Sequence, residues 1–222
     1  MSVVDFHFDP MCPFAYQTSL WIREVRAQTG LTVNWRFFSL EEVNRVDGKR
    51  HPWERPWSYG FGQMRVGAWL RRRSMAELDR WYEVVGRAFH EQGVKTHDPA
   101  VHAALLADNG LPADAVDAAL ADDSTLDEVR ADHERAVTMF GAHGVPTIVL
   151  PSGYALYGPV VVPAPTGAAA LRLWDLVRAC EEFPHLYELR HPKTVDDLTH
   201  IAEVFRPYLS ARDWHTVENP AP

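Results

Sequence analysis

The chain has 222 residues, which is enough for one domain with an insertion or for two small domains, and 46% of them are hydrophobic, so we expect a sizeable core. Its 30 acidic and 22 basic residues give a formal net charge of −8, which disfavours a nucleic-acid-binding protein. The sequence has no apolar stretch of the ~18 residues that span a membrane and no secretion signal at its start, so we expect a cytoplasmic protein without membrane contact.

The first predicted elements form a β-α-β unit. Alternating apolar residues predict a strand at about 2–8, and β-branched and aromatic residues predict a second strand at 31–38. The stretch between them predicts a helix that starts near Cys12 and ends at Gly30, a residue type common at helix C-termini. Two strands connected through a helix in this way are expected to be parallel, with a right-handed crossover.

The pattern becomes helical from about residue 41 to about residue 142. Apolar residues recur at helical spacing, two stretches have a proline near the first turn, and one begins with a capping box formed by Ser124 and Asp127. We expect an inserted helical unit that covers the functional site. The aromatic residues at 51–64 either pack the interior of this unit or line an apolar pocket in it.

Strand signals return near the end of the chain. They occur at 145–150, and a Ser-Gly turn connects this stretch to a partner strand at 154–158. A helix at 167–183 and a last helix at about 195–209 follow.

The order of elements indicates the fold class. β-α-β, a helical insertion and then β-β-α predict an α/β protein with a thioredoxin-like fold and a large inserted all-helical subdomain. In this interpretation residues 1–40 and 143–222 form the thioredoxin-like domain, and residues 41–142 form the inserted subdomain.

Cys12 lies at the predicted strand-to-helix turn, in the stretch DPMCPFAY. The free backbone N–H groups and the dipole of a helix that starts there stabilise an anion, so we expect a nucleophilic cysteine that is largely thiolate near neutral pH. Pro13 suits the first helical position, and Phe14 places an apolar side chain beside the sulfur. Asp9 works against this prediction, because a nearby negative charge raises a thiol pKa. A buried structural cysteine is the alternative.

The other cysteine is Cys180. It follows Leu176 and Val177 at a spacing that places it on the apolar stripe of its predicted helix, so we expect a buried, inert thiol. None of the eleven histidines has a recognised metal-ligand spacing, and no phosphate- or dinucleotide-binding motif occurs. We therefore expect no metal cofactor.

Several stretches together resemble a known family. The segment DFHFDPMCPFAYQTSLWI is similar to the active-site region of DsbA-family thioredoxin-fold proteins, and most closely to the actinobacterial branch of mycothiol-dependent nitroreductases, or mycoredoxin-2-like proteins. In that branch a strand ending in Asp-Pro leads into Cys-Pro-Trp-Cys. The other similar stretches are GVPTI at 144–148, YGPV at 157–160, LWD at 173–175 and FPHLYELRHPKT at 183–194.

The resemblance implies roles for the residues around Cys12. Cys12 itself matches the family's nucleophile, and Pro13 and Phe14 match the dipeptide that tunes it. Ala15 stands at the position of the resolving cysteine and supplies no sulfur.

The resemblance also implies a thiol-binding segment at Val145, Pro146 and Thr147. Pro146 matches the family's cis-proline, and Val145 matches the residue whose backbone pairs with a bound thiol. We therefore predict a cis Val145–Pro146 bond that faces Cys12.

The leading hypothesis is a cytoplasmic thiol-dependent oxidoreductase that acts through Cys12 alone. Without a second cysteine at position 15, the mixed disulfide would be released by a low-molecular-weight thiol, mycothiol or glutathione, and mycothiol is favoured by the resemblance. The expected partners are this thiol and a small organic substrate, and a homodimer is left open.

Two other hypotheses stay open. The first is a thiol-dependent transferase or isomerase that acts on a small aromatic or conjugated substrate, similar to kappa-class glutathione transferases or hydroxychromene-carboxylate isomerases. The second is a binding protein that has lost redox activity together with the second cysteine.

Overall fold

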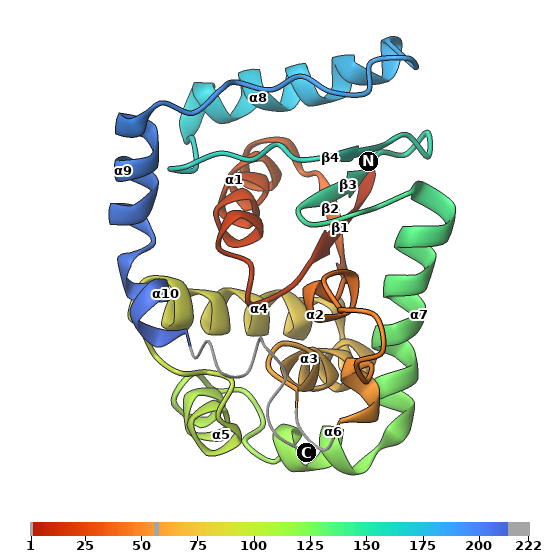
Figure 1. The fold of residues 1–222 in the computed structure, drawn as a ribbon, viewed down its shortest axis with the longest axis vertical. Coiled ribbons are helices and arrows are strands. Elements are labelled where there is room, and N and C mark those ends of the chain that lie inside the picture. Colours follow the sequence, from red (N-terminus) through yellow and green to blue (C-terminus); the bar gives the residue numbers. More distant parts are fainter. Residues whose placement is uncertain (1, 56–57, 213–222) are drawn as a thin grey trace.

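The computed structural model describes residues 2–55 and 58–212 (Figure 1). Within them a four-stranded sheet has the order β2-β1-β3-β4. Strand β1 (Val3–Phe8) pairs in parallel with β2 (Thr32–Phe37) and antiparallel with β3 (Thr147–Val149), and β3 pairs antiparallel with β4 (Ala155–Tyr157). This sheet and its β-α-β start have the thioredoxin-like arrangement that the sequence predicted.

Helices make up most of the remaining described chain. They are α1 (Pro13–Thr29), α2 (Leu40–Val43), α3 (Phe61–Arg73), α4 (Met75–His90), α5 (Pro99–Asp108), α6 (Ala115–Ala121), α7 (Asp123–Phe140), α8 (Gly167–Ala179), α9 (Val195–Val204) and α10 (Arg206–Ala211), with 3-10 turns η1 (Pro52–Glu54) and η2 (Cys180–Glu182). Between β2 and β3 the described residues form helices and loops and contain no strand. One apolar core includes residues from both the sheet and these helices.

Helix boundaries follow the capping chemistry of the sequence, with two corrections. Gly30 ends α1 in the left-handed conformation, at a φ of 71°, as predicted. The predicted capping box at Ser124 is wrong, because α7 begins two residues earlier, where the side chain of Asp122 caps the helix by accepting the N–H of Ser124. The prediction of one last helix at about 195–209 is also wrong. The helix breaks at Phe205 into α9 and α10, where Pro207 lacks the N–H that a continuous helix needs.

The two faces of the sheet are covered by different helices. Phe8 and Trp35 point to one face, where both pack on Tyr82 of α4, with ring centroids 3.9 and 5.3 Å apart. His7 points to the opposite face, as strand alternation requires, and lies 6.3 Å from the ring of Phe140 in α7. The sheet is therefore buried between the α1–α4 pair and α7 (Figure 1).

Helices α1 and α4 approach each other closely at Gly86. A Cβ atom built on this glycine would lie 2.5 Å from the ring of Tyr16, which is too close for any side chain. The hydroxyl of Tyr16 donates to Glu91 at 2.6 Å, at the end of α4. This contact places the first turn of α1 directly against α4.

Cys180 does not have the predicted surroundings. It is only half-buried, it lies in η2 just after α8, and its Sγ donates to the carbonyl of Leu176 at 3.3 Å. The buried stripe of α8 runs through Ala170, Trp174 and Val177, and Leu176 is 55% exposed. The prediction was wrong because the stripe turns away from Cys180 in the last helical turn.

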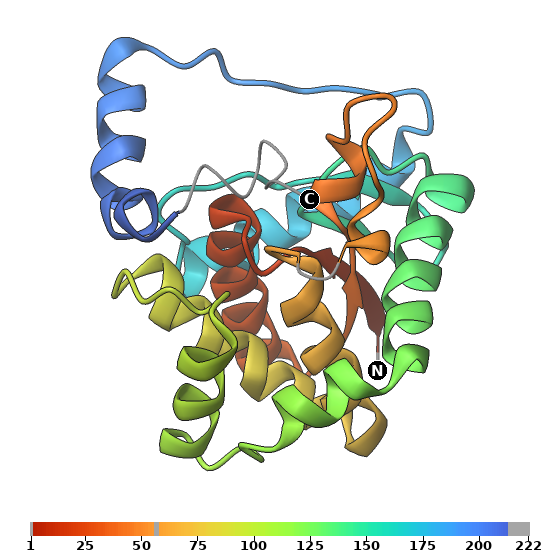
Figure 2. The same ribbon diagram turned by 60° about the horizontal axis from the view of Figure 1, so that its bottom comes forward.

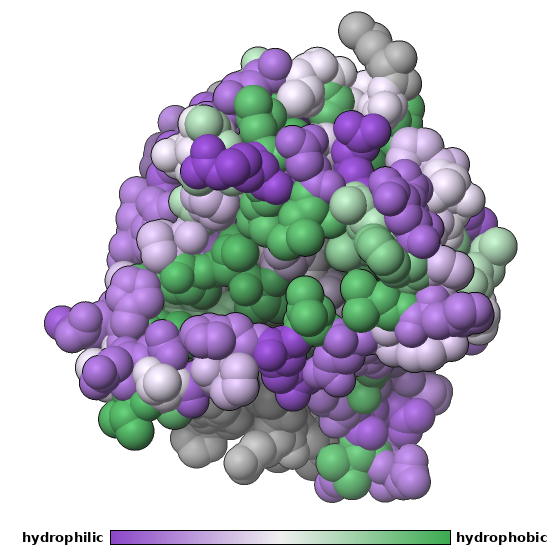
Figure 3. Space-filling view, turned by 90° about the horizontal axis from the view of Figure 1, so that it is seen from above, coloured by the Kyte–Doolittle hydropathy of each residue, from purple (hydrophilic) through white to green (hydrophobic). Residues whose placement is uncertain are grey.

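After η2 the chain forms a long extended segment, residues 183–194, which leads to α9 and α10 (Figures 1 and 2). Figure 2 shows this segment running from α8 to α9 along one edge of the molecule. Seen from above, the face that carries α8 shows apolar side chains gathered around a hollow (Figure 3). Within the described ranges, no helix combines the length and the apolar character needed to cross a membrane.

Candidate active site

Cys12 lies where the chain turns from β1 into α1, and it is the N-cap residue of that helix. Its Sγ accepts a hydrogen bond from the backbone N–H of Ala15 at 3.4 Å and donates one to the backbone carbonyl of Val145 at 3.6 Å. The residue is only 6% exposed. The sulfur is thus held between a helix N-terminus and the loop that leads into β3.

That loop contains the predicted thiol-binding segment. The Val145–Pro146 peptide bond is cis, and the carbonyl of Pro146 accepts an N–H from the chain just after β4 at 2.8 Å. Thr147 directs its hydroxyl to the carbonyl of Gly144 at 2.8 Å, so this side chain is used within the loop. The structure therefore brings Val145 to Cys12, and it gives Thr147 a structural contact.

The three residues after Cys12 have different surroundings. Pro13 occupies the first position of α1, where no N–H is needed. Phe14 is half-buried, and its ring lies edge-on to Phe205, the N-cap residue of α10, with centroids 5.0 Å apart. Ala15 is fully buried, so its methyl group fills the place of a resolving cysteine.

The predicted thiolate is contradicted by the burial of Cys12. Burial raises the pKa of the thiol to about 12, because the charged form loses its water; the N–H of Ala15 opposes this, and the charge of Asp9 adds to it. The helix start is where the sequence placed it, but its stabilising effect on the anion is smaller than the cost of desolvation. In this structure Cys12 is a neutral thiol near pH 7.

Asp9 is a buried carboxyl group three residues before Cys12. It is 1% exposed and accepts the backbone N–H of Met11 at 2.9 Å and of Leu40 at 2.8 Å. Burial raises its pKa to about 7, against the effect of these two hydrogen bonds, and the charge of Glu41 adds to the rise. Asp9 therefore fastens the active-site turn to the start of α2 and can change its charge near neutral pH.

His90 supports the same turn from α4. Its Nε2 donates to the carbonyl of Pro10 at 2.8 Å, and its ring stacks on Tyr16 with centroids 4.9 Å apart. Burial lowers the pKa of His90 to about 3, so the ring is neutral. The sequence showed only a histidine beside Glu91, and nothing in the local pattern revealed its contact with the active-site loop.

Tyr157 of β4 lies beside the same loop. Its ring is 4.9 Å from that of His143, and a side chain at Gly144 would meet it at 3.2 Å. Burial raises the pKa of the Tyr157 hydroxyl, and the charge of Cys12 adds to this. Tyr157 is 48% exposed, so its ring is available to a molecule bound near Cys12.

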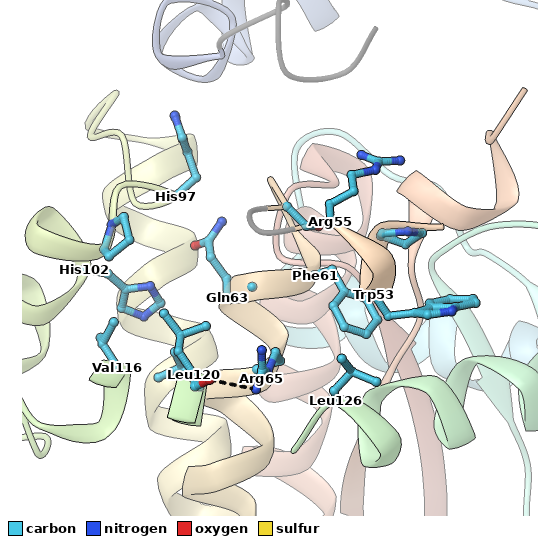
Figure 4. A pocket seen from close by; sticks show the side chains of 15 residues that line it. Trp53, Arg55, Phe61, Gln63, Arg65, His97, His102, Val116, Leu120 and Leu126 are labelled. Carbon is cyan, nitrogen blue, oxygen red and sulfur yellow. Dashed lines mark hydrogen bonds between the residues drawn. The ribbon is translucent and has the colours of Figure 1, made fainter. Parts of the chain in front are cut away.

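A pocket in the helical region lies apart from Cys12. Its empty space, open solvent included, is about 580 Å³. Figure 4 shows Gln63 between the two histidines in and just before α5 and the aromatic residues of the 51–64 stretch. Trp53 and Phe61 line it, as the sequence allowed, whereas Cys12 does not. Gln63 connects the two regions, because its Nε2 lies 2.9 Å from the Sδ of Met11.

The described part of the chain contains no group of three or more His, Cys, Asp or Glu side chains arranged to hold a metal ion. The reactive groups near the turn are thus a thiol, a carboxyl group and a phenol. Such groups suit chemistry on sulfur.

Comparison with known proteins identifies the family. The family model described as mycothiol-dependent nitroreductase Rv2466c matches residues 11–191 of this chain. The chain belongs to the Rv2466c-like family. The description of the Rv2466c-like family is that of a mycothiol-dependent enzyme, so the chain is an enzyme with a thiol-dependent function.

The chain is also similar to a curated protein other than Rv2466c. An uncharacterized protein of Mycobacterium tuberculosis (strain ATCC 25618 / H37Rv), Rv2286c, is 58% identical to this Rv2466c-like chain over 217 residues, which are 98% of this chain and 94% of the relative. The similarity therefore includes the C-terminal helices, which lie beyond the family model's match.

Solved structures show the fold of this Rv2466c-like protein. A probable DsbA oxidoreductase from Streptomyces coelicolor aligns with a TM-score of 0.58 at 21% identity, over 88% of this chain and 94% of that one. The cytosolic disulfide reductase DsbM from Pseudomonas aeruginosa, solved with GSH, gives 0.56 at 20% identity, over 79% and 99%. A 2-hydroxychromene-2-carboxylate isomerase gives 0.58 at 16% identity, over 81% and 95%. At these identities the structures establish a DsbA-type thioredoxin fold and nothing further.

Proposed function

We propose that this enzyme reduces a small disulfide or a similarly reducible organic substrate through Cys12 alone, with mycothiol as the electron donor. The observation that supports this most directly is the pair Cys12 and Ala15. The sulfur accepts the N–H of Ala15 at a helix N-terminus, and the residue that would resolve a disulfide has only a buried methyl group. Cys180 is not a substitute, because it lies in η2 with its sulfur turned to the carbonyl of Leu176.

The proposed reaction has two exchanges. The Cys12 thiolate attacks one sulfur of a disulfide, the other sulfur leaves as a thiolate and takes up a proton, and a mixed disulfide with Cys12 remains. A mycothiol thiolate then attacks this mixed disulfide at the substrate sulfur, and Cys12 leaves as the anion. One substrate disulfide and one mycothiol thereby become one free thiol and one mycothiol mixed disulfide.

Three groups of the protein assist these exchanges. The N–H of Ala15 stabilises Cys12 each time it leaves as an anion. In the resting state the thiol of Cys12 donates its proton to the carbonyl of Val145. This hydrogen bond must break, and the thiol must lose its proton, before the sulfur attacks. Asp9 has a pKa of about 7 and can take up or release a proton near the site without a large energetic cost.

The test is to weigh the intact protein after incubation with oxidised mycothiol or oxidised glutathione. We expect one adduct with the mass of one mycothiol, located on the Cys12 peptide, and its loss when reduced mycothiol is added. A Cys180→Ala variant is the matched control and should form the adduct normally. The proposal would be rejected if neither oxidised mycothiol nor oxidised glutathione formed an adduct on Cys12.

A second candidate is a thiol-dependent isomerase or transferase, in which a bound low-molecular-weight thiol attacks the substrate. The observation in its favour is the neutral Cys12, whose thiol proton is donated to Val145, because a protonated sulfur can hold another thiol near it without being oxidised. The two candidates differ in stoichiometry. The oxidoreductase oxidises the thiol to a disulfide with each turnover, whereas an isomerase returns the thiol unchanged and a transferase couples it to the product without oxidising it.

A further inference from the structure

The C-terminal helix α10 packs against the active-site turn, although it lies outside the segment that the family model matches, residues 11–191. Phe205 and Tyr208 are 6% and 7% exposed. The ring centroids of Phe205 and Phe14 are 5.0 Å apart, and those of Tyr208 and His90 are 5.4 Å apart. Together with residues of the turn and the helical region they form a small apolar cluster, separate from the main core: Met11, Tyr59, Phe89, Phe205, Tyr208 and Ala211.

The chain that attaches α10 to the rest of the protein is almost unsupported. Every residue from 181 to 196 is exposed, including Tyr187 at 88% and Leu189 at 83%. Helix α9 has no buried residue, and only Ile201 and Val204 pack, partly buried, against the small cluster. Figure 2 shows the extended segment and α9 running along the outside of the molecule. Segments with so little burial open at low free energy, so the connection offers little resistance to a movement of α10, which is held mainly by the small cluster and not by the main core.

The space that α10 covers suits a planar apolar group. Met11 and Phe14 lie on either side of Cys12 in the sequence; Met11 shares the small cluster with Phe89, and Phe14 packs against that cluster. His90 adds one polar atom. Because its Nε2 donates to Pro10, its buried Nδ1 is an acceptor, and this atom makes no hydrogen bond with any described residue. Aromatic walls with one buried acceptor fit an aromatic group that carries an O–H or N–H.

We propose that α10 is the resident occupant of an aromatic binding site beside Cys12, and that an aromatic substrate displaces Phe205 and Tyr208 to reach the thiol. The inference rests on the proposed function only in taking Cys12 as the reacting group. It also explains why a reactive cysteine is 6% exposed in the free protein. Displacement lowers the apparent affinity of the substrate by the fraction of molecules that are open.

The first experiment uses the full-length chain with Phe205→Ala and Tyr208→Ala combined. The control is Leu209→Ala on the same helix, where the side chain is 43% exposed. Each protein is treated with N-phenylmaleimide or N-ethylmaleimide, and modification of the Cys12 peptide is measured by mass spectrometry. Each unit by which the thiol pKa falls raises the thiolate fraction about tenfold, so we expect at least that increase in the double variant. The modification rate with N-phenylmaleimide, divided by the rate with N-ethylmaleimide, should also be higher for Cys12 in the double variant than for free cysteine.

Three results would overturn the proposal. They are equal rates in the wild-type and double-variant proteins, an increase of the same size in Leu209→Ala, or faster reaction without any preference for the phenyl reagent. The last result would show that the opened space is not an aromatic site.

A second experiment uses the unmutated chain, so it does not depend on how well the variants fold. The Cys12 adduct of N-phenylmaleimide is compared with the acetamide adduct by amide hydrogen exchange. We expect faster exchange in α10 for the phenyl adduct only, with α4 unchanged in both. Unchanged protection of α10 in the phenyl adduct would reject displacement. Neither experiment needs a low-molecular-weight thiol or turnover, so the proposed function can fail while this inference holds.

Discussion

The backbone N–H of Ala15 points at the sulfur of Cys12 from 3.4 Å, while the side chain of Ala15 is fully buried. In the proposed reaction, one residue thus stabilises the anion of Cys12 and also withholds the second sulfur that would resolve its disulfides. The methyl group is packed in the core, so the site is built for one cysteine.

Replacing Ala15 by Cys should separate the two candidate functions. In an oxidoreductase the variant should form a disulfide with Cys12 and turn over disulfide substrates faster than the wild type. In an isomerase it should be slower, because Cys12 is trapped as a disulfide. The measurement is turnover with mycothiol and with glutathione, and Ala15→Ser is the control for the added volume. Equal activity in the Ser and Cys variants would show that position 15 has no part in the redox step.

Replacing Cys12 by Ser should abolish thiol-dependent turnover, because a hydroxyl group is not ionised near neutral pH and forms no mixed disulfide. Cys180→Ala should keep full turnover and cost less than about 1 kcal/mol of unfolding free energy, since that sulfur is half-buried. Steady-state rates and urea unfolding test both statements. Full activity in Cys12→Ser would place the reactive centre elsewhere.

The alkylation rate of Cys12 should rise with pH along a curve whose midpoint lies well above the ~8.5 of a free cysteine. The cause is burial, which raises the pKa of the thiol to about 12. The same thiol in the urea-unfolded chain is the internal control. Because the folded pKa is above the unfolded one, the folded state keeps the proton longer, and the unfolding free energy should fall as the pH rises from about 8.5 toward 12. A folded midpoint at or below that of the unfolded chain would contradict the burial.

Asp9 should make the protein less stable at neutral pH than in mild acid. Its pKa rises to about 7 on folding, so between the unfolded value of ~3.9 and about 7 the folded state holds a proton that the unfolded state has lost. The contribution of Asp9 to the unfolding free energy falls through this range by at most about 1.4 kcal/mol per pH unit.

Asp9→Asn should remove this pH dependence and lower the pKa of Cys12, because the charge of Asp9 opposes the thiolate. Denaturant unfolding at pH 5 and pH 7, for wild type and variant, measures the first effect, and the alkylation curve measures the second. An unchanged difference in stability between the two pH values would show that another group is responsible.

Gly86→Ala should destabilise the protein by about 1–3 kcal/mol, because a Cβ atom there meets the ring of Tyr16 at 2.5 Å and must push α1 away from α4. Gly62→Ala in α3 is the matched control. It has open space around its Cβ position and should be neutral or gain up to about 1 kcal/mol from helix propensity. Urea unfolding of both variants decides the matter, and equal effects would mean that the helices do not meet as closely as described.

Much of the fold could be predicted because its signals are local. The alternation in β1, Pro13 at the helix start and Gly30 at its end each act within a few residues, and the structure has these elements in the predicted places. The pairing of Cys12 with the Val145 loop joins segments far apart in the chain, and only a resemblance to known proteins suggested it.

The wrong predictions concern properties that depend on elements far away in the sequence. Whether Cys12 is charged depends on how much water reaches it, and that depends on the core around it and on the loop before β3 as well as on its own helix. Cys180 was misplaced for a similar reason, since periodicity gives a stripe but not the turn at which neighbouring elements stop covering it. The contact of His90 with Pro10 joins two stretches whose sequences give no sign of each other.

The enclosure of Cys12 has a consequence for how the protein survives oxidants. A thiolate that meets peroxide becomes a sulfenic acid, and a partner cysteine normally rescues it as a disulfide before further oxygen is added. Ala15 offers no such rescue, so an exposed thiolate here would be open to irreversible damage. A neutral sulfur inside the protein reacts slowly with peroxide. If Cys12 reacts as proposed, burial protects the lone sulfur between catalytic cycles, which is the task that a second cysteine performs in dithiol enzymes.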